Sequence, residues 1–284
     1  MADTQIDWCD KVWNPVTGCS KVSTGCKNCY AERMAKRLAG RAGYPAENPF
    51  AVTLHPDRLN EPLRWRKPRR VFVCSMGDLF HADVPDGFIF RVWQTMAATP
   101  WHTYQVLTKR PERMAEFTGV CAVMPPFALP NVWLGVSVED QATADERIPH
   151  LLRCPAAVRF VSYEPALGPV DFDGDGYAGP GWLRGWHTEA EHDPRCDGSC
   201  SAGHCPVPVQ TENEKLDWII AGGESGPHAR PAHPDWFRSV RDQCKAAGVA
   251  FFMKQITERG RKVPFESWPV DLQVREWPKG GERG

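Results

Sequence analysis

The chain has 284 residues, of which 42% are hydrophobic, so it has enough apolar material for a packed core, which excludes a largely disordered protein. The 34 Lys and Arg residues nearly balance the 35 Asp and Glu residues, and this balance argues against tight, sequence-blind binding to a phosphate backbone. A local basic patch is compatible with this overall balance. Because no apolar run reaches roughly 18 residues and the amino terminus has no signal pattern, we expect a cytoplasmic protein without membrane contact.

Short apolar runs recur along the chain and predict buried parallel strands. They are rich in Val, Ile and Phe without strict alternation, which is typical of strands covered on both faces. The predicted strands are Arg70–Ser75, Thr103–Thr108, Val132–Val138, Val158–Ser162, Asp217–Ala221 and Val249–Met253, with two earlier candidates at Ile6–Val12 and Phe50–Leu54.

Helical patterns fill most of the intervals between these strands. One predicted helix covers Ala31–Leu38, one follows the N-cap candidate Asp86, and two begin at Pro111 and Pro234. Another covers residues 141–152, where Pro149 should bend or end the helix. The strand spacing of about 30 residues is the length of a βαβ unit. We therefore predict an α/β fold, namely a partial or complete (β/α) barrel of parallel strands that forms one domain over residues 1–284.

One long interval holds a Cys- and His-rich insertion, residues 171–213. It shows almost no periodic apolar signal, so it cannot bury enough surface to order itself. We therefore expect a bound metal to stabilise its folded conformation. A zinc site, a second iron–sulfur cluster and a loop without metal all remain open. The expected ligands are Cys196, Cys200, Cys205 and His204, with His187 or His192 as substitutes for the histidine.

A second group of cysteines lies near the amino terminus, where Cys19, Cys26 and Cys29 have the spacing C-x6-C-x2-C. In a reducing compartment, clustered thiols indicate bound metal rather than disulfides. Three ligands leave a structural zinc ion one short, so that Cys9 or a distant histidine would be needed. They leave one iron of a [4Fe–4S] cluster open to a further ligand. The scattered cysteines, by contrast, are expected to be small core residues.

Charged residues follow the predicted strands, and barrel enzymes place their chemistry at these carboxyl ends. Ser75 and Thr108 close two of the strands and should approach the same mouth. The candidate catalytic residues are Lys109, Glu139, Glu164 and Glu224. The other charged or polar side chains expected at the mouth are Asp78, Arg110, Lys254 and Gln255.

A basic segment with a tryptophan, RWRKPRR at residues 64–70, precedes one predicted strand. Interleaved basic and aromatic side chains suit contact with a nucleic acid or nucleotide. A solvated charged turn explains the pattern equally well.

Longer motifs resemble a known family over nearly the whole chain. They are IDWCDKVWNPVTGCSKVSTGCKNCYAERMAKRL, VFVCSMGDLFH, LTKRPERM, WLGVSVED, SYEPALG and IIAGGESG. They resemble an uncharacterised phage and prophage family with a three-Cys motif, which is itself similar to radical S-adenosylmethionine (SAM) enzymes of the spore photoproduct lyase type.

The resemblance implies that Cys19, Cys26 and Cys29 hold a [4Fe–4S] cluster whose open iron binds SAM. The usual spacing is C-x3-C-x2-C with an aromatic residue before the last cysteine, whereas this chain has three more residues in the first gap and Asn28 at the aromatic position. The resemblance also implies a set of residues that contact the cofactor, with Asp78 accepting from the ammonium of SAM. They are Tyr30, Ser75, Met76, Gly77 and Asp78.

The implied activity is that of an iron–sulfur enzyme which takes an electron from an external donor and generates a 5′-deoxyadenosyl radical from SAM. Its substrate is unknown, with a nucleic acid or nucleotide as the expected class, and no protein partner is identified. A zinc-stabilised module that binds nucleic acid or protein is the main alternative. A hydrolase that holds a divalent metal on Glu139, Glu164 and Glu224 is another.

The metal site expected in the insertion can be tested separately from the first cysteine group. Replacing Cys200 with Ser should lower bound zinc or iron by about one site per chain, because a site of this kind needs four ligands. Metal analysis of the purified variant measures the change. Unchanged metal content would make the insertion an ordinary loop.

Overall fold

The computed structural model describes residues 4, 6–122, 129–174, 181–189, 207–210 and 215–279. Its main feature is a seven-stranded sheet in which every neighbouring pair of strands is parallel. The order of these strands across the sheet is the same as their order along the chain. This order is that of a (β/α) barrel. The strands are β1 (Lys11–Trp13), β4 (Arg70–Val73), β5 (Thr103–Thr108), β6 (Val132–Val138), β7 (Val158–Tyr163), β10 (Trp218–Gly222) and β11 (Ala250–Gln255).

The edge strands β1 and β11 do not pair with each other in the described part of the chain, so the barrel is partial. The predicted fold class is therefore confirmed in its partial form. The sequence places the six later strands to within two residues at each end, because each is a buried run rich in β-branched and aromatic residues.

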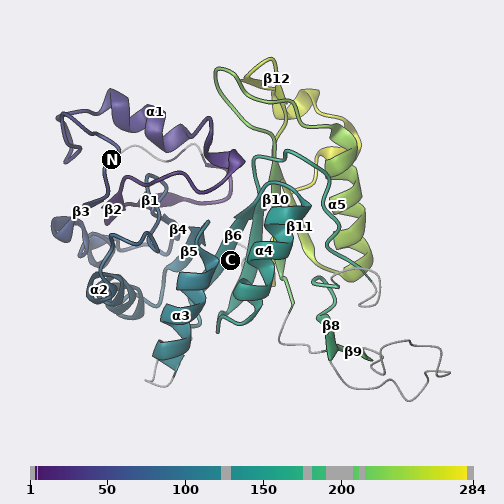
Figure 1. Cartoon of the computed structure of the whole chain (residues 1–284), viewed down its shortest axis with the longest axis horizontal. Helices are drawn as coiled ribbons and strands as arrows, with labels where there is room; N and C mark the ends of the chain where they lie inside the picture. The colour runs from purple at the N-terminus through teal and green to yellow at the C-terminus, as the bar shows by residue number, and fades with distance from the viewer. Residues whose placement is uncertain are drawn as a thin grey trace.

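Helices are arranged around the sheet, with α1 set apart from the rest (Figure 1). Side chains from α2, α4 and α5 share one large core with the outer face of the strands. None of the described helices is long and apolar enough to cross a membrane. The α-helices are α1 (Tyr30–Arg37), α2 (Asp86–Ala97), α3 (Pro111–Ala122), α4 (Gln141–Leu152) and α5 (Pro234–Ala247).

The helix ends follow the sequence signals in most cases. Helix α3 begins at Pro111, and α5 begins at Pro234 and ends at Gly248, whose φ of 69° a residue with a side chain would adopt less readily. Pro149 does not end α4, which continues to Leu152. The prediction that Asp86 caps α2 is wrong, because Pro85 occupies the cap position and the carboxylate of Asp86 pairs with a neighbouring arginine.

The inner face of the sheet is filled by aromatic side chains and by the segment before β1. Trp8 is 2% exposed, and its ring centroid lies 4.6 Å from that of Phe72 and 6.4 Å from that of Trp218. Cys9 is buried in the same cluster, as are Phe160 and other strand residues. The predicted strand at Ile6–Val12 is thus reduced to β1, because its first residues turn into the barrel interior instead of extending the sheet.

The predicted strand at Phe50–Leu54 does not join the barrel. Only Thr53–Leu54 is extended, as β3, and it pairs antiparallel with β2 (Val16–Thr17), which continues the chain after β1. The remaining elements are the hairpin strands β12 (Thr257–Glu258) and β13 (Arg261–Lys262), and the short 3-10 helices η1 (Thr24–Cys26), η2 (Pro56–Arg58), η3 (Pro62–Arg64), η4 (Phe265–Ser267) and η5 (Val270–Leu272).

The insertion contributes to the core at its start and carries a hairpin further on. Phe172, Trp182 and Leu183 are buried in the main core. The antiparallel pair β8 (Trp186–Glu189) and β9 (Val207–Gln210) projects away from the sheet (Figure 1). The ligands predicted for the insertion lie outside the described residues, namely Cys196, Cys200, Cys205 and His204.

The interior position of Trp8 predicts a large stability loss for Trp8→Ala. Removing a buried indole leaves a cavity and should lower the free energy of unfolding by about 3–5 kcal/mol. Urea unfolding followed by circular dichroism measures it. Trp101→Ala is the matched control, because Trp101 is 46% exposed, and should cost about 1 kcal/mol or less. Equal losses would contradict the interior role of Trp8.

Candidate metal centre at the carboxyl ends of the strands

The cysteines predicted to bind a metal lie in one loop, residues 18–29, which we call the cysteine loop. Cys19, Cys26 and Cys29 are free thiols and are neither fully buried nor fully exposed. The loop contains η1 and ends where α1 begins, so Cys29 is the N-cap residue of that helix. Cys29 also packs against the small apolar cluster that contains Met76.

The start of the cysteine loop is bound to the segment that follows β4. The amide of Gly18 donates to the carbonyl of Met76 at 2.9 Å, and Gly18 forms a parallel bridge with Gly77. Gly18 has a φ of 82°, and a Cβ at this position would overlap the carbonyl oxygen of Ala51. Only glycine therefore fits here, and this contact places Cys19 beside the predicted cofactor-binding residues.

The side chain of Asn14 holds the same segment from the other side. Its Oδ1 accepts from the Ser75 hydroxyl at 3.2 Å and from the Met76 amide at 3.0 Å. Tyr30, the remaining residue of the predicted cofactor set, is the first residue of α1 and is 54% exposed beside Cys29. The structure thus brings Ser75, Met76 and Gly77 next to the cysteine loop.

Asp78 is buried, and its carboxylate accepts four hydrogen bonds from the chain. Oδ1 accepts from the Phe80 amide and the Thr108 hydroxyl, and Oδ2 accepts from the Lys109 amide at 3.2 Å and from Arg110 Nη1 at 2.9 Å. An ionised carboxylate offers about four acceptor sites. The binding of a SAM ammonium by Asp78 stays a prediction, and these contacts favour a role in positioning Arg110.

Arg110 links the end of β5 to the first cysteine. Its Nη1 donates to Cys19 Sγ at 3.3 Å, and its Nη2 donates to the carbonyl and hydroxyl oxygens of Ser20 at 3.0 and 2.9 Å. Ser20 Oγ also lies 2.8 Å from His81 Nε2. Burial and the charge of Asp78 raise the pKa of Cys19 to about 11, although Arg110 opposes them. Burial therefore disfavours the thiolate form of Cys19.

Glu139, at the end of β6, is fully buried under the middle of the cysteine loop. Its carboxylate pairs with Lys109 at 2.7 Å and with Arg147 at 3.3 Å, and it accepts from the Ser23 hydroxyl at 2.9 Å. A Cβ on Gly25 would overlap this carboxylate, so the loop backbone lies directly on it. Burial alone would raise the pKa of Glu139, but Lys109 and Arg147 lower it overall.

Glu224, at the end of β10, holds the last part of the cysteine loop. It pairs with Arg230 at 2.6 Å and accepts from Asn28 Nδ2 at 2.9 Å. Arg230 in turn donates to the carbonyl of Thr24 at 3.0 Å. Burial acts to raise the pKa of Glu224, but the hydrogen bonds from Arg230 and Asn28 lower it overall. Side chains from three strand ends therefore fix the loop along its length.

Glu164, which follows β7, and Lys254 of β11 form a separate ion pair, with 2.5 Å between Glu164 Oε2 and Lys254 Nζ. Among the described residues, this pair forms no hydrogen bond or ion pair with the cysteine loop. Gln255 is buried, and its amide donates to the Gly223 carbonyl. Each of Glu139, Glu164 and Glu224 thus faces a cation. Within the described ranges, no three Cys, His, Asp or Glu side chains are gathered as a preformed metal site, and this holds for Cys19, Cys26 and Cys29 as well as for these carboxylates.

Several residues that fix the loop were not anticipated from the sequence. They are Ser23, His81, Arg147 and Arg230. Arg147 carries a signal that can be recognised afterwards, because it lies on the apolar side of α4 beside Ile148 and is 1% exposed. Arginine is rarely buried without a partner of opposite charge. Cys9 lies in the barrel interior and donates to a backbone carbonyl there, away from the other three thiols.

Comparison with known families gives one match, to a family described as a protein of unknown function (DUF5131), over residues 3–275. The chain belongs to this family. The comparison with curated proteins gives no match. The predicted assignment to an uncharacterised family is confirmed to that extent, whereas its phage origin stays a prediction.

Among solved structures, the chain is similar to spore photoproduct lyase. A complex with dinucleoside spore photoproduct is 12% identical with a TM-score of 0.40, and the match covers 80% of this chain and 58% of that one. A mutant with bound AdoMet and dinucleoside spore photoproduct is 12% identical with a TM-score of 0.41, over 65% and 51% of the two chains. The chain thus spans little more than half the length of these structures.

The buried carboxylate of Glu139 predicts a pH-dependent contribution to stability. Glu139→Gln leaves Lys109 and Arg147 without an anion and should lower the free energy of unfolding by about 3–5 kcal/mol at neutral pH. Because the pKa of Glu139 is lower in the folded protein than in the unfolded chain, about 4.3, the wild type loses this contribution as pH falls through the folded value. The difference between the two proteins should therefore shrink in acid.

Urea unfolding of both proteins at a series of pH values checks this expectation. Glu112→Gln is the matched control, since Glu112 is exposed in the first turn of α3 and should show almost no difference at any pH. A loss in Glu139→Gln that stays constant down to the lowest pH would contradict the ionised state assigned to Glu139.

Proposed function

We propose that the chain is an iron–sulfur enzyme of radical SAM type. The observation that carries the proposal is the position of the cysteine loop, with its three free thiols at the carboxyl ends of a partial parallel barrel. In barrels of this kind the chemistry takes place at that end. Residues that follow β4, β5, β6 and β10 form hydrogen bonds with the loop.

The residues that would hold a [4Fe–4S] cluster are Cys19, Cys26 and Cys29. The fit rests on the chemistry of the donor set, which is three free thiols within one short loop, and the loop would have to bring their sulfur atoms together when the cluster binds, because they are not gathered as a metal site in this structure. A cluster held by three thiolates keeps one iron open. When bound, it would supply the electron that cleaves SAM reductively, and an external electron donor would have to reduce it.

The chain's own residues would orient this site. Arg110 holds Cys19 and Ser20 through its guanidinium group, while Asp78 fixes the position of that group. Glu139 and Glu224 fix the centre and end of the loop. Because these carboxylates are buried and paired, the loop is held at a defined height above the strand ends. Catalytic roles for Lys109, Glu139, Glu164 and Glu224 stay proposals.

The segment of Ser75, Met76 and Gly77 would contact SAM, because it lies beside Cys19 and because Met76 belongs to the small apolar group of side chains against which Cys29 packs. Exposed Tyr30 stands at the other side of Cys29. We propose a nucleic acid or nucleotide as the substrate class, which is the class that the sequence resemblance implies. Zinc or a second iron–sulfur cluster at Cys196, Cys200, Cys205 and His204 also remains a proposal.

Anaerobic reconstitution with iron and sulfide tests the proposed activity. With a strong reductant and SAM, the wild type should form 5′-deoxyadenosine even without its substrate, because uncoupled cleavage needs only the cluster and SAM. Cys26→Ala should lose both the cluster absorbance and the product, since two thiolates do not hold the cluster. Iron analysis and chromatography measure the two effects.

Cys154→Ala is the matched control, because Cys154 is a free, buried cysteine at the end of α4, away from the loop. It should retain iron and product formation. Wild-type protein with full iron occupancy and no 5′-deoxyadenosine would refute the radical SAM proposal. A colourless wild type that binds zinc in place of iron would favour the zinc-stabilised binding module.

A further inference from the structure

Basic and aromatic side chains gather at the amino-terminal end of the sheet, opposite the cysteine loop. The segment 64–70 leads into β4 there, and Lys11 begins the neighbouring strand β1 with its Nζ 4.7 Å from the ring centroid of Trp65. Trp101 precedes β5 at the same end. We call this set the basic–aromatic surface, made up of Lys11, Arg64, Trp65, Arg66, Lys67, Arg69 and Trp101.

His102 lies beneath this surface and connects its parts. It is 1% exposed, and its ring centroid lies 5.7 Å from that of Trp65 and 5.6 Å from that of Trp101. The indole N–H of Trp101 points toward the Trp65 carbonyl at 3.3 Å. Burial lowers the pKa of His102, and the charges of Arg69 and Lys11 lower it further. Arg69 and Lys11 therefore both act on the imidazole that contacts the two indoles.

The cations of the basic–aromatic surface lack acidic partners. Among the described residues, Lys11, Arg64, Arg66, Lys67 and Arg69 form no ion pair, whereas the adjacent Arg70 pairs with an aspartate. The chain as a whole has a net charge of −1, so these unpaired charges are a local excess. Such an excess attracts a polyanion by releasing its condensed counterions.

The exposed ring of Trp101 favours a single-stranded nucleic acid over a duplex or a membrane as the polyanion that would bind here. It is 46% exposed, and its N–H is directed into the protein, which leaves a fixed ring for stacking. Unpaired bases stack on exposed rings of this kind, while bases within a duplex are covered by their neighbours. An anionic membrane would need a larger apolar face, and Leu63 is the one other large apolar side chain near this surface that is exposed among the described residues.

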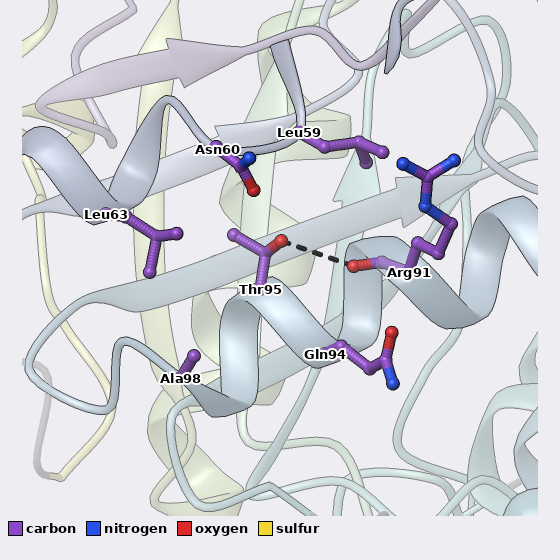
Figure 2. A pocket seen from close by; sticks show the side chains of 7 residues that line it. All are labelled: Leu59, Asn60, Leu63, Arg91, Gln94, Thr95 and Ala98. Atoms are coloured by element: carbon purple, nitrogen blue, oxygen red, sulfur yellow. Dashed lines mark hydrogen bonds between the residues drawn. The ribbon is translucent and has the colours of Figure 1, made fainter. Parts of the chain in front are cut away.

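A pocket of about 240 Å³ borders the basic–aromatic surface. Leu63 precedes Arg64 in the chain, and Ala98 lies three residues before Trp101, so the pocket begins where the surface ends. Figure 2 shows Leu63 and Asn60 facing the α2 side chains, with the Arg91 guanidinium at the far end. The amides of Asn60 and Gln94 and the charge of Arg91 suit the polar edge of a base or a phosphate.

We propose that the basic–aromatic surface binds single-stranded nucleic acid, with phosphates on its cations and a base stacked on Trp101. The proposal does not rest on the iron–sulfur function, because the surface lies at the opposite end of the strands and uses none of the cysteine loop. A strand held there would be bound in the absence of cluster and SAM.

Fluorescence anisotropy with a labelled single-stranded oligonucleotide of about 20 nucleotides, longer than a typical binding site, tests the proposal on the full chain without added metal. Trp101→Ala should weaken binding about tenfold because stacking is lost, and Trp101→Phe should retain most of the affinity. The double variant Arg66→Ala with Lys67→Ala should weaken binding and reduce the slope of log K against log salt by about 1.4.

A charge-matched control is Arg37→Ala with Lys245→Ala, which removes two exposed cations from α1 and α5 and should leave binding unchanged. Thermal unfolding confirms that each variant is folded. The proposal is overturned if the surface variants bind like the wild type, if the control loses as much affinity, or if duplex DNA or anionic lipid vesicles bind as tightly as the single strand.

Discussion

The buried carboxylate of Glu139 is the contact on which the arrangement of the candidate site depends. It lies between Lys109 and Arg147 and under the backbone of the cysteine loop at Gly25. An unpaired charge in this position would cost several kcal/mol, so the two cations and the carboxylate must be buried together. Their shared burial joins β5, β6 and α4, and the Ser23 hydroxyl brings the loop into the same network.

A similar arrangement recurs at other strand ends, where a buried carboxylate pairs with an arginine and that arginine donates hydrogen bonds to the loop. Asp78 and Arg110 act on the first cysteine, and Glu224 and Arg230 act on the last part of the loop. Arg230 contacts both oxygens of Glu224, and Arg110 contacts Asp78, Cys19 and Ser20 through its planar guanidinium group, so each arginine sets both a distance and a direction. Several such contacts along twelve residues restrain the loop more than any single one would.

The sequence predicts the sheet well because buried parallel strands appear as uninterrupted apolar runs, as in Val132–Val138. It also predicts which strand ends carry charge, since those residues follow directly. It does not predict pairing, because whether Glu139 meets Lys109 or a metal depends on contacts across distant segments. The segment at Phe50–Leu54 shows the same limit, because a short apolar run does not reveal whether its partner is parallel or antiparallel.

The charge balance around the cysteine loop bears on how a metal would enter it. Lys109, Arg110 and Arg230 each have a carboxylate partner, and burial raises the pKa of Cys19 to about 11. The position of the loop depends on hydrogen bonds such as those from Ser23 to Glu139 and from Asn28 to Glu224. Metal binding would then release protons and place thiolates where little free positive charge remains. The positive charge of the bound metal would therefore be the main compensation for the thiolates.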